Sequence, residues 1–177
     1  MQKYAIGIDV GGTNIKVGLF DENMKMTRSL QTLTDKELEA EKMMDHLAAL
    51  VRRLLAEAGV SASEVRGVGA AFPSFIDYEK GIVVETTNII SLNDLPVRQM
   101  LQERLGLPVY LDNNANAGAL AEHAMGAGRG HEHMIYATVS TGIGGALILN
   151  GKLYRGMHGM AGEIGHMFIT DSAGYPC

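Results

Sequence analysis

Apolar and polar residues alternate near the start of the chain in a way that predicts strands. The apolar run 4–9 and the loosely alternating segment 15–20 lie on either side of Gly11-Gly12-Thr13-Asn14. Two short strands separated by a glycine pair predict a tight hairpin. Residues 26–33 are a candidate third strand.

The hydrophobic period becomes helical after this strand run. From residue 35 to residue 58 the apolar side chains recur at spacings of three and four. This spacing predicts an amphipathic helix, with Thr34 or Asp35 as its N-cap and Gly59 as its C-cap.

The remainder alternates strands with helices before a new run of strands opens. Strands are predicted at 66–72, 82–85, 108–112, 133–140, 145–149 and 152–154, and helices at about 95–105 and 115–125, with Asn150-Gly151 as a type I′ turn. The order predicts an α/β protein with an N-terminal lobe at residues 1–114. Residues 115–177 read as the beginning of a second, similar lobe.

Composition and charge narrow the class of protein. The chain has 177 residues, 46% of them hydrophobic and 20% charged, which is typical of a globular protein. The net charge of -5, with no basic cluster longer than Arg52-Arg53, argues against a nucleic-acid partner. No apolar stretch approaches the roughly 18 residues of a membrane span. A single Cys excludes an internal disulfide, so we expect a reducing, cytoplasmic setting.

Two glycine-rich segments are candidate phosphate sites. In Asp9-Val-Gly-Gly-Thr-Asn14, a glycine pair after a strand lets backbone N–H groups approach an anion. The P-loop pattern is absent, and a strand follows where a Rossmann motif needs a helix. The remaining candidate is a phosphate-binding turn between two strands, with Asp9 placed to hold hydrated Mg²⁺ beside ATP. The alternative is an ordinary Gly-Gly hairpin, but Ser140-Thr-Gly-Ile-Gly-Gly145 repeats the pattern in the second strand run.

Four segments together resemble the ROK family. They are DVGGTN, LDNNANAGALAEH, STGIGGALILNGKLYRG and AGEIGH, in this order. The family comprises bacterial sugar kinases and related repressors of the actin/Hsp70/hexokinase type. The resemblance implies an actin-like ATPase (ribonuclease H-like) fold with two lobes and a mixed sheet of βββαβα type. It also implies that sugar binds in the cleft and that ATP, lying across both lobes, donates its γ-phosphoryl group to a sugar hydroxyl.

The resemblance also assigns roles to residues. It implies phosphate and cofactor binding by Asp9, Gly11, Gly12, Thr13, Thr141 and Gly142, and sugar binding by Asn88, Asn113, Glu163 and His166. His166 and Cys177 lie where the family's structural zinc site begins, as a His followed by a Cys-x-Cys-Gly-x-x-Gly-Cys run. Because the likeness stops inside this motif, we expect the chain to be the N-terminal portion of a longer protein that forms a homodimer.

Two positions depart from the family pattern. The family's catalytic motif has an Asp general base where this chain has Asn114. An amide can hydrogen-bond a sugar but cannot accept a proton, and losing a general base typically costs about 10²–10⁴ in rate. Asp112, two residues earlier, is a possible replacement if both residues face one side of an extended segment. Ser74 stands where a glycine is more usual and adds a side chain near the expected sugar pocket.

The sequence is compatible with three functions. An ATP-dependent hexose kinase is favoured by the paired glycine motifs and the sugar-ligand set. A catalytically impaired sugar-binding or sugar-sensing protein is favoured by Asn114. A ROK repressor is least favoured, because the chain begins at its first strand and leaves no room for a helix-turn-helix.

Overall fold

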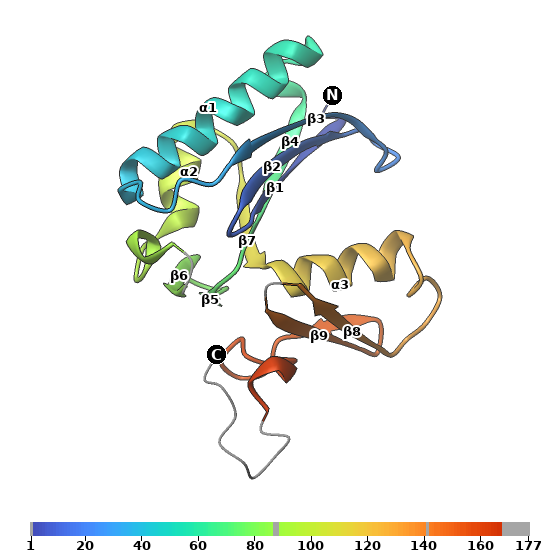
Figure 1. Cartoon of the computed structure of the whole chain (residues 1–177). Coiled ribbons are helices and arrows are strands. Elements are labelled where there is room, and N and C mark those ends of the chain that lie inside the picture. The colour runs from blue at the N-terminus through green and yellow to red at the C-terminus, as the bar shows by residue number, and fades with distance from the viewer. Residues whose placement is uncertain (1, 87–88, 141, 168–177) are drawn as a thin grey trace. The chain divides into compact units, whose positions relative to one another are not determined.

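The computed structural model describes residues 2–86, 89–140 and 142–167, and its chain divides into two compact units. Unit 1 is Met1–Asn114 and unit 2 is Ala115–Cys177. Figure 1 shows the course of the chain and the labels of the elements.

Unit 1 contains a five-stranded mixed sheet. Its strands are β1 (Tyr4–Val10), β2 (Asn14–Phe20), β3 (Met26–Leu33), β4 (Val65–Phe72) and β7 (Val109–Asn113), in the spatial order β3-β2-β1-β4-β7. The first three strands pair antiparallel, whereas β1, β4 and β7 run parallel. This is the predicted α/β architecture of βββαβα type, and the expected actin-like fold is therefore confirmed for this unit.

Two helices cover one face of this sheet (Figure 1). They are α1 (Ala40–Ala58) and α2 (Val97–Leu105). Alternate residues of the strands, such as Ile6, Ile8 and Val10, are buried and belong to one hydrophobic cluster with the apolar stripe of α1. The intervening residues therefore face the opposite side of the sheet.

Helix α1 begins five residues later than the sequence pattern predicts. The predicted cap, Thr34, instead donates its backbone N–H to the Thr13 carbonyl and its hydroxyl to the Gly11 carbonyl, at 2.9 and 2.7 Å. These bonds tie Thr34 to the β1–β2 turn. Asp35, the other predicted cap, accepts the Glu37 backbone N–H at 3.1 Å in a turn that precedes the helix, and the N-cap of α1 is Glu39. The C-terminal prediction is confirmed, since Gly59 ends α1 in the left-handed conformation with φ of 66°.

The described residues also form a small hairpin and three short 3-10 helices. Strands β5 (Phe75–Asp77) and β6 (Ile82–Glu85) pair antiparallel, and the 3-10 helices are η1 (Ala62–Glu64), η2 (Ile90–Leu92) and η3 (Ile164–His166). The turn of this hairpin requires Gly81, which has φ of 73° and donates its N–H to the Asp77 carbonyl at 2.7 Å.

Unit 2 is built on a three-stranded antiparallel sheet. Its strands are β8 (Met134–Val139), β9 (Ile143–Leu149) and β10 (Lys152–Tyr154), in the order β10-β9-β8. Helix α3 (Asn114–Met125) contributes Ala119 to a small core with Ala146 and Ile148. The predicted turn at Asn150-Gly151 has positive φ at both residues, 52° and 71°, as a type I′ turn requires. In the described ranges, no helix is long and apolar enough to cross a bilayer.

Candidate functional site

The turn between β1 and β2 is held in one tight conformation. Gly11 donates its N–H to the Asn14 carbonyl at 2.9 Å, and a Cβ on Gly11 would lie 2.9 Å from that same oxygen. The two bonds from Thr34 fix the turn from the side of β3. Glycine is therefore required at position 11, and the exposed Thr13 presents its hydroxyl from a fixed backbone.

The register of the sheet brings two carboxylates into one row. Asp9 pairs with Ala71 on β4, and Ala71 pairs with Asp112 on β7. Each is the penultimate residue of its parallel strand, so the row lies at the carboxyl ends of β1, β4 and β7. Because strands in a sheet are about 4.8 Å apart, the two Asp backbones lie about 10 Å apart. We call this row and the β1–β2 turn the carboxyl edge.

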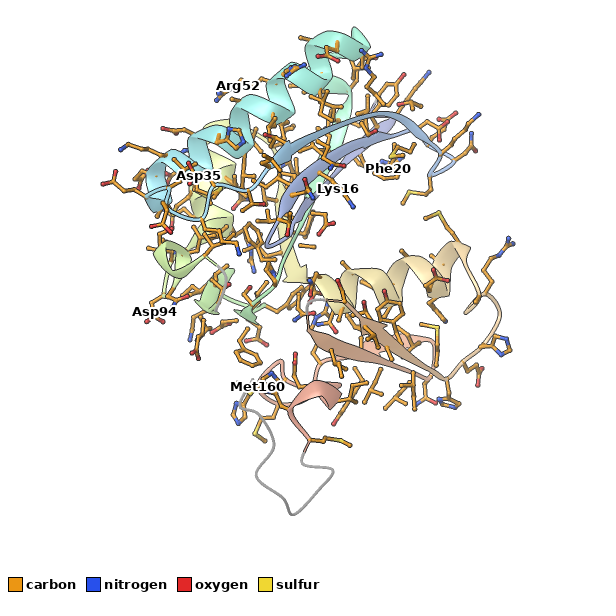
Figure 2. The ribbon with its side chains drawn as sticks, viewed as in Figure 1. Lys16, Phe20, Asp35, Arg52, Asp94 and Met160 are labelled. Carbon is orange, nitrogen blue, oxygen red and sulfur yellow. The ribbon has the colours of Figure 1, made fainter. Side chains whose placement is uncertain are left out.

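A lysine extends the same row on the other side of Asp9. Lys16 on β2 is the direct cross-strand partner of Asp9 and is exposed (Figure 2). An ammonium group next to a carboxylate and a glycine turn suits a phosphate bound together with a cation. Sequence reasoning missed Lys16, although a hairpin that pairs Val10 with Ile15 necessarily places residue 16 opposite residue 9.

Asn113 and Ser74 meet at the carboxyl edge. Asn113 is the last residue of β7, and its side-chain amide donates to the Ser74 carbonyl at 3.3 Å. Asp112 accepts a hydrogen bond from the Asn113 backbone N–H at 2.9 Å. The predicted sugar ligand Asn113 therefore has a fixed place at the ends of β4 and β7.

Asn114 and Asp112 do not share an extended segment. Strand β7 ends at Asn113, and the exposed Asn114 is the first residue of α3. The alternation that would place both side chains on one side of a strand is interrupted at this boundary. Asn116 is the third residue of this helix and is only 5% exposed.

The second glycine motif forms the turn between β8 and β9. Ser140 donates its N–H to the Gly142 carbonyl at 2.9 Å, and Gly142 is exposed with free space where a Cβ would stand. This turn joins antiparallel strands, as the β1–β2 turn does. The predicted ligand Thr141 lies outside the described residues.

Glu163 is carried on a loop that packs closely on β9. Gly162 has φ of 92°, and a Cβ there would lie 2.8 Å from the Ala146 Cα atom. A Cβ on Gly165 would collide with the Ile143 carbonyl oxygen. Backbone therefore contacts backbone on both sides of Glu163, which fixes its position relative to β9.

The environment of Glu163 changes its acidity. Partial burial raises the pKa of this carboxyl, and the charge of nearby His166 opposes the shift. His166 is exposed at the end of η3 and donates its backbone N–H to the Glu163 carbonyl at 3.2 Å. The two predicted sugar ligands are thus neighbours on one helical turn.

Two further predicted ligands lie outside the described residues, namely Asn88 and Cys177. Among the residues that the structure describes, no three His, Cys, Asp or Glu side chains are grouped so that they could hold a metal ion. His166 is therefore the one predicted zinc ligand whose surroundings can be described, and they do not by themselves form a zinc site.

A five-stranded mixed sheet of βββαβα type defines a lobe of the actin-like fold. A family model described as "ROK family" matches residues 5–177, and the chain belongs to this family.

Kinases and repressors are found among the relatives at similar identity. The chain is 34% identical over 175 residues to a glucokinase of Halalkalibacterium halodurans, covering 99% of this chain and 53% of the relative. It is 35% identical over 167 residues to the xylose repressor of Bacillus subtilis, covering 94% of this chain and 42% of the repressor. The chain thus spans about half the length of the curated relatives it matches.

A solved structure of a ROK family protein has the same fold as this chain. A ROK family glucokinase from Streptomyces griseus, in complex with glucose and AMPPNP, superposes with a TM-score of 0.84 at 34% identity. The match covers 94% of this chain and 51% of that chain.

Proposed function

We propose that the protein is a sugar kinase that transfers the γ-phosphoryl group of ATP to a hydroxyl of a hexose or related sugar. The observation that carries this proposal is the row Asp9–Ala71–Asp112 at the carboxyl ends of three parallel strands, directly beside the β1–β2 glycine turn. In open α/β sheets, ligands bind outside these strand ends. The kinases among the relatives support the choice of reaction.

The phosphate side of the site is assigned to the two glycine turns. The backbone at Gly11, Gly12 and Thr13 would cradle one part of the phosphate chain, and Thr141 with Gly142 another. Asp9 offers the carboxylate oxygen that a hydrated Mg²⁺ prefers, and its exposure leaves room for the ion's water ligands. When bound, the ion would neutralise charge on the phosphates. Lys16 adds a positive charge beside them.

The sugar side is assigned to Asn88, Asn113, Asn114, Glu163 and His166. Amides and a carboxylate suit this role because sugar hydroxyls need fixed donors and acceptors when water is removed. A structural zinc held by His166, Cys177 and further cysteines, a homodimer and a cytoplasmic location complete the proposal for the whole protein.

The proton of the attacking hydroxyl needs an acceptor, and the amide of Asn114 cannot serve. Asp112 is the nearest carboxylate in the sequence, half-buried at the end of β7. Since phosphoryl transfer depends mainly on positioning and charge stabilisation, a displaced base slows the reaction without abolishing it. We therefore expect transfer about 10²–10⁴ slower than with a carboxylate at position 114.

The second candidate is a sugar-binding protein that does not transfer phosphate. Asn114 favours it, because an exposed amide at the start of α3 keeps the hydrogen bonds of the site without the base. The xylose repressors among the relatives show that the family includes proteins named for a regulatory role.

A sugar-dependent ADP-release assay separates the two candidates. We expect slow release by the wild type with at least one of glucose, mannose, galactose and xylose, and a gain of about 10²–10⁴ in Asn114→Asp. Asn23→Ala, in the exposed β2–β3 turn, is the control and should leave the rate unchanged. Release by Asn114→Asp but none by the wild type would favour the binding protein.

A further inference from the structure

The side-chain hydroxyl of Ser74 is buried without a hydrogen-bond partner. The residue is 7% exposed, and within the described part of the chain its Oγ atom neither donates nor accepts a hydrogen bond. The Ser74 backbone, in contrast, is bonded on both sides. Its N–H donates to the Phe72 carbonyl at 3.0 Å, and its own carbonyl accepts from the Asn113 amide at 3.3 Å.

An unpartnered buried hydroxyl is unusual. The large majority of buried side-chain polar atoms in native proteins have a partner. A buried alanine or glycine would need no hydrogen-bond partner at this position, whereas the Ser74 hydroxyl needs one that the described residues do not supply.

The location of Ser74 indicates what this partner is. The residue follows the end of β4 by two positions and precedes β5, and Asn113 connects it to the end of β7. Ser74 thus lies at the carboxyl edge, on the sugar side of the proposed site. Of the residues there, Asn113 already has a proposed role in sugar binding, and it holds the Ser74 peptide in place.

We infer that the Ser74 hydroxyl forms a hydrogen bond with one hydroxyl group of the bound monosaccharide and sets specificity at that position. The inference rests on the proposed sugar site. A serine hydroxyl can both donate to and accept from a sugar hydroxyl. A site with a polar group committed to one substrate hydroxyl rejects the analogue that lacks it, because the buried group then stays unpaired.

A double-mutant cycle between protein and ligand tests this directly. The protein variants are wild type, Ser74→Ala and Ser74→Gly, and the ligands are the tightest binder among glucose, mannose, galactose and xylose with its monodeoxy analogues. Dissociation constants are measured by titration calorimetry. Ser29→Ala, an exposed serine on β3, is the matched control.

One deoxy position should behave differently from all others. For wild type, removal of that hydroxyl should weaken binding about tenfold, the usual worth of one hydrogen bond. Both Ser74 variants should bind the parent sugar about tenfold more weakly and should no longer distinguish it from that one analogue. Ser29→Ala should keep the wild-type pattern.

Two outcomes would overturn the inference, and they differ in what else they remove. The first outcome is that wild type binds sugar, but removal of each hydroxyl costs the same affinity in wild type as in both variants. Ser74 then has no role in specificity, and the proposed function stands. The same conclusion follows if the variants weaken all ligands equally. If wild type binds none of the four sugars, the proposed sugar site and the inference both fail.

Discussion

Glu163 combines partial burial with a histidine neighbour on the same short helical turn. Burial raises the pKa of its carboxyl above the ordinary value of 4.5, and His166 acts in the opposite direction. A carboxylate in this setting is a good acceptor for sugar hydroxyls, but the folded protein bears a cost for keeping it charged.

The raised pKa makes stability depend on pH in a definite direction. Above pH 4.5 the folded protein binds more protons at this site than the unfolded chain does. The stability contributed by Glu163 is therefore present at low pH and is lost as the pH rises toward the folded pKa. Glu163→Gln should remove this dependence, so its melting temperature relative to wild type should be higher at pH 7 than at pH 4.

Thermal denaturation of wild type and Glu163→Gln at the two pH values measures this effect. Glu132→Gln, at an exposed position, serves as the control. An equal offset between Glu163→Gln and wild type at both pH values would show that burial does not disfavour the charged form.

At the scale of elements, the contact between β9 and the loop 162–166 decides where Glu163 lies. Gly145, Gly162 and Gly165 all lie where a Cβ would meet backbone of the other segment. Such close packing leaves no space for a larger residue at these three positions, because backbone atoms cannot move aside as the end of a flexible side chain can.

A glycine substitution in this contact should be costly. Gly165→Ala would place its Cβ against the Ile143 carbonyl and should lower the free energy of unfolding by about 1–3 kcal/mol, the usual range for overpacking. Gly142→Ala, where the Cβ has free space, should change it by less than about 0.5 kcal/mol. Urea denaturation of both variants tests the contrast, and equal stabilities would contradict this packing.

Local sequence signals predict most elements but not their exact limits. The β1–β2 hairpin follows from the glycine pair, and the C-terminus of α1 follows from Gly59. The start of α1 is misjudged because Thr34 bonds Gly11 and Thr13, residues of a turn more than twenty positions earlier. A cap preference is a local property, and here a tertiary contact overrides it.

At the scale of the whole molecule, the proposed site depends on strand order. Asp9 and Asp112 lie about one hundred residues apart in the sequence, and only the parallel order β1-β4-β7 brings them into one row. The sequence indicates each residue through its motif, but it does not give this register. The burial of the Ser74 hydroxyl is likewise a product of packing, and no local pattern around Pro73-Ser74 announces it.

On the proposed function, the carboxyl edge of unit 1 binds a sugar. Titration calorimetry with glucose, mannose, galactose and xylose tests it most directly, comparing wild type with Asn113→Ala and with Asn23→Ala as the control. We expect at least one sugar to bind wild type and the control with a stoichiometry of one. Asn113→Ala should bind the same sugar about tenfold more weakly, or not measurably. Absence of binding by wild type to all four sugars, or unchanged affinity in Asn113→Ala, would contradict the claim.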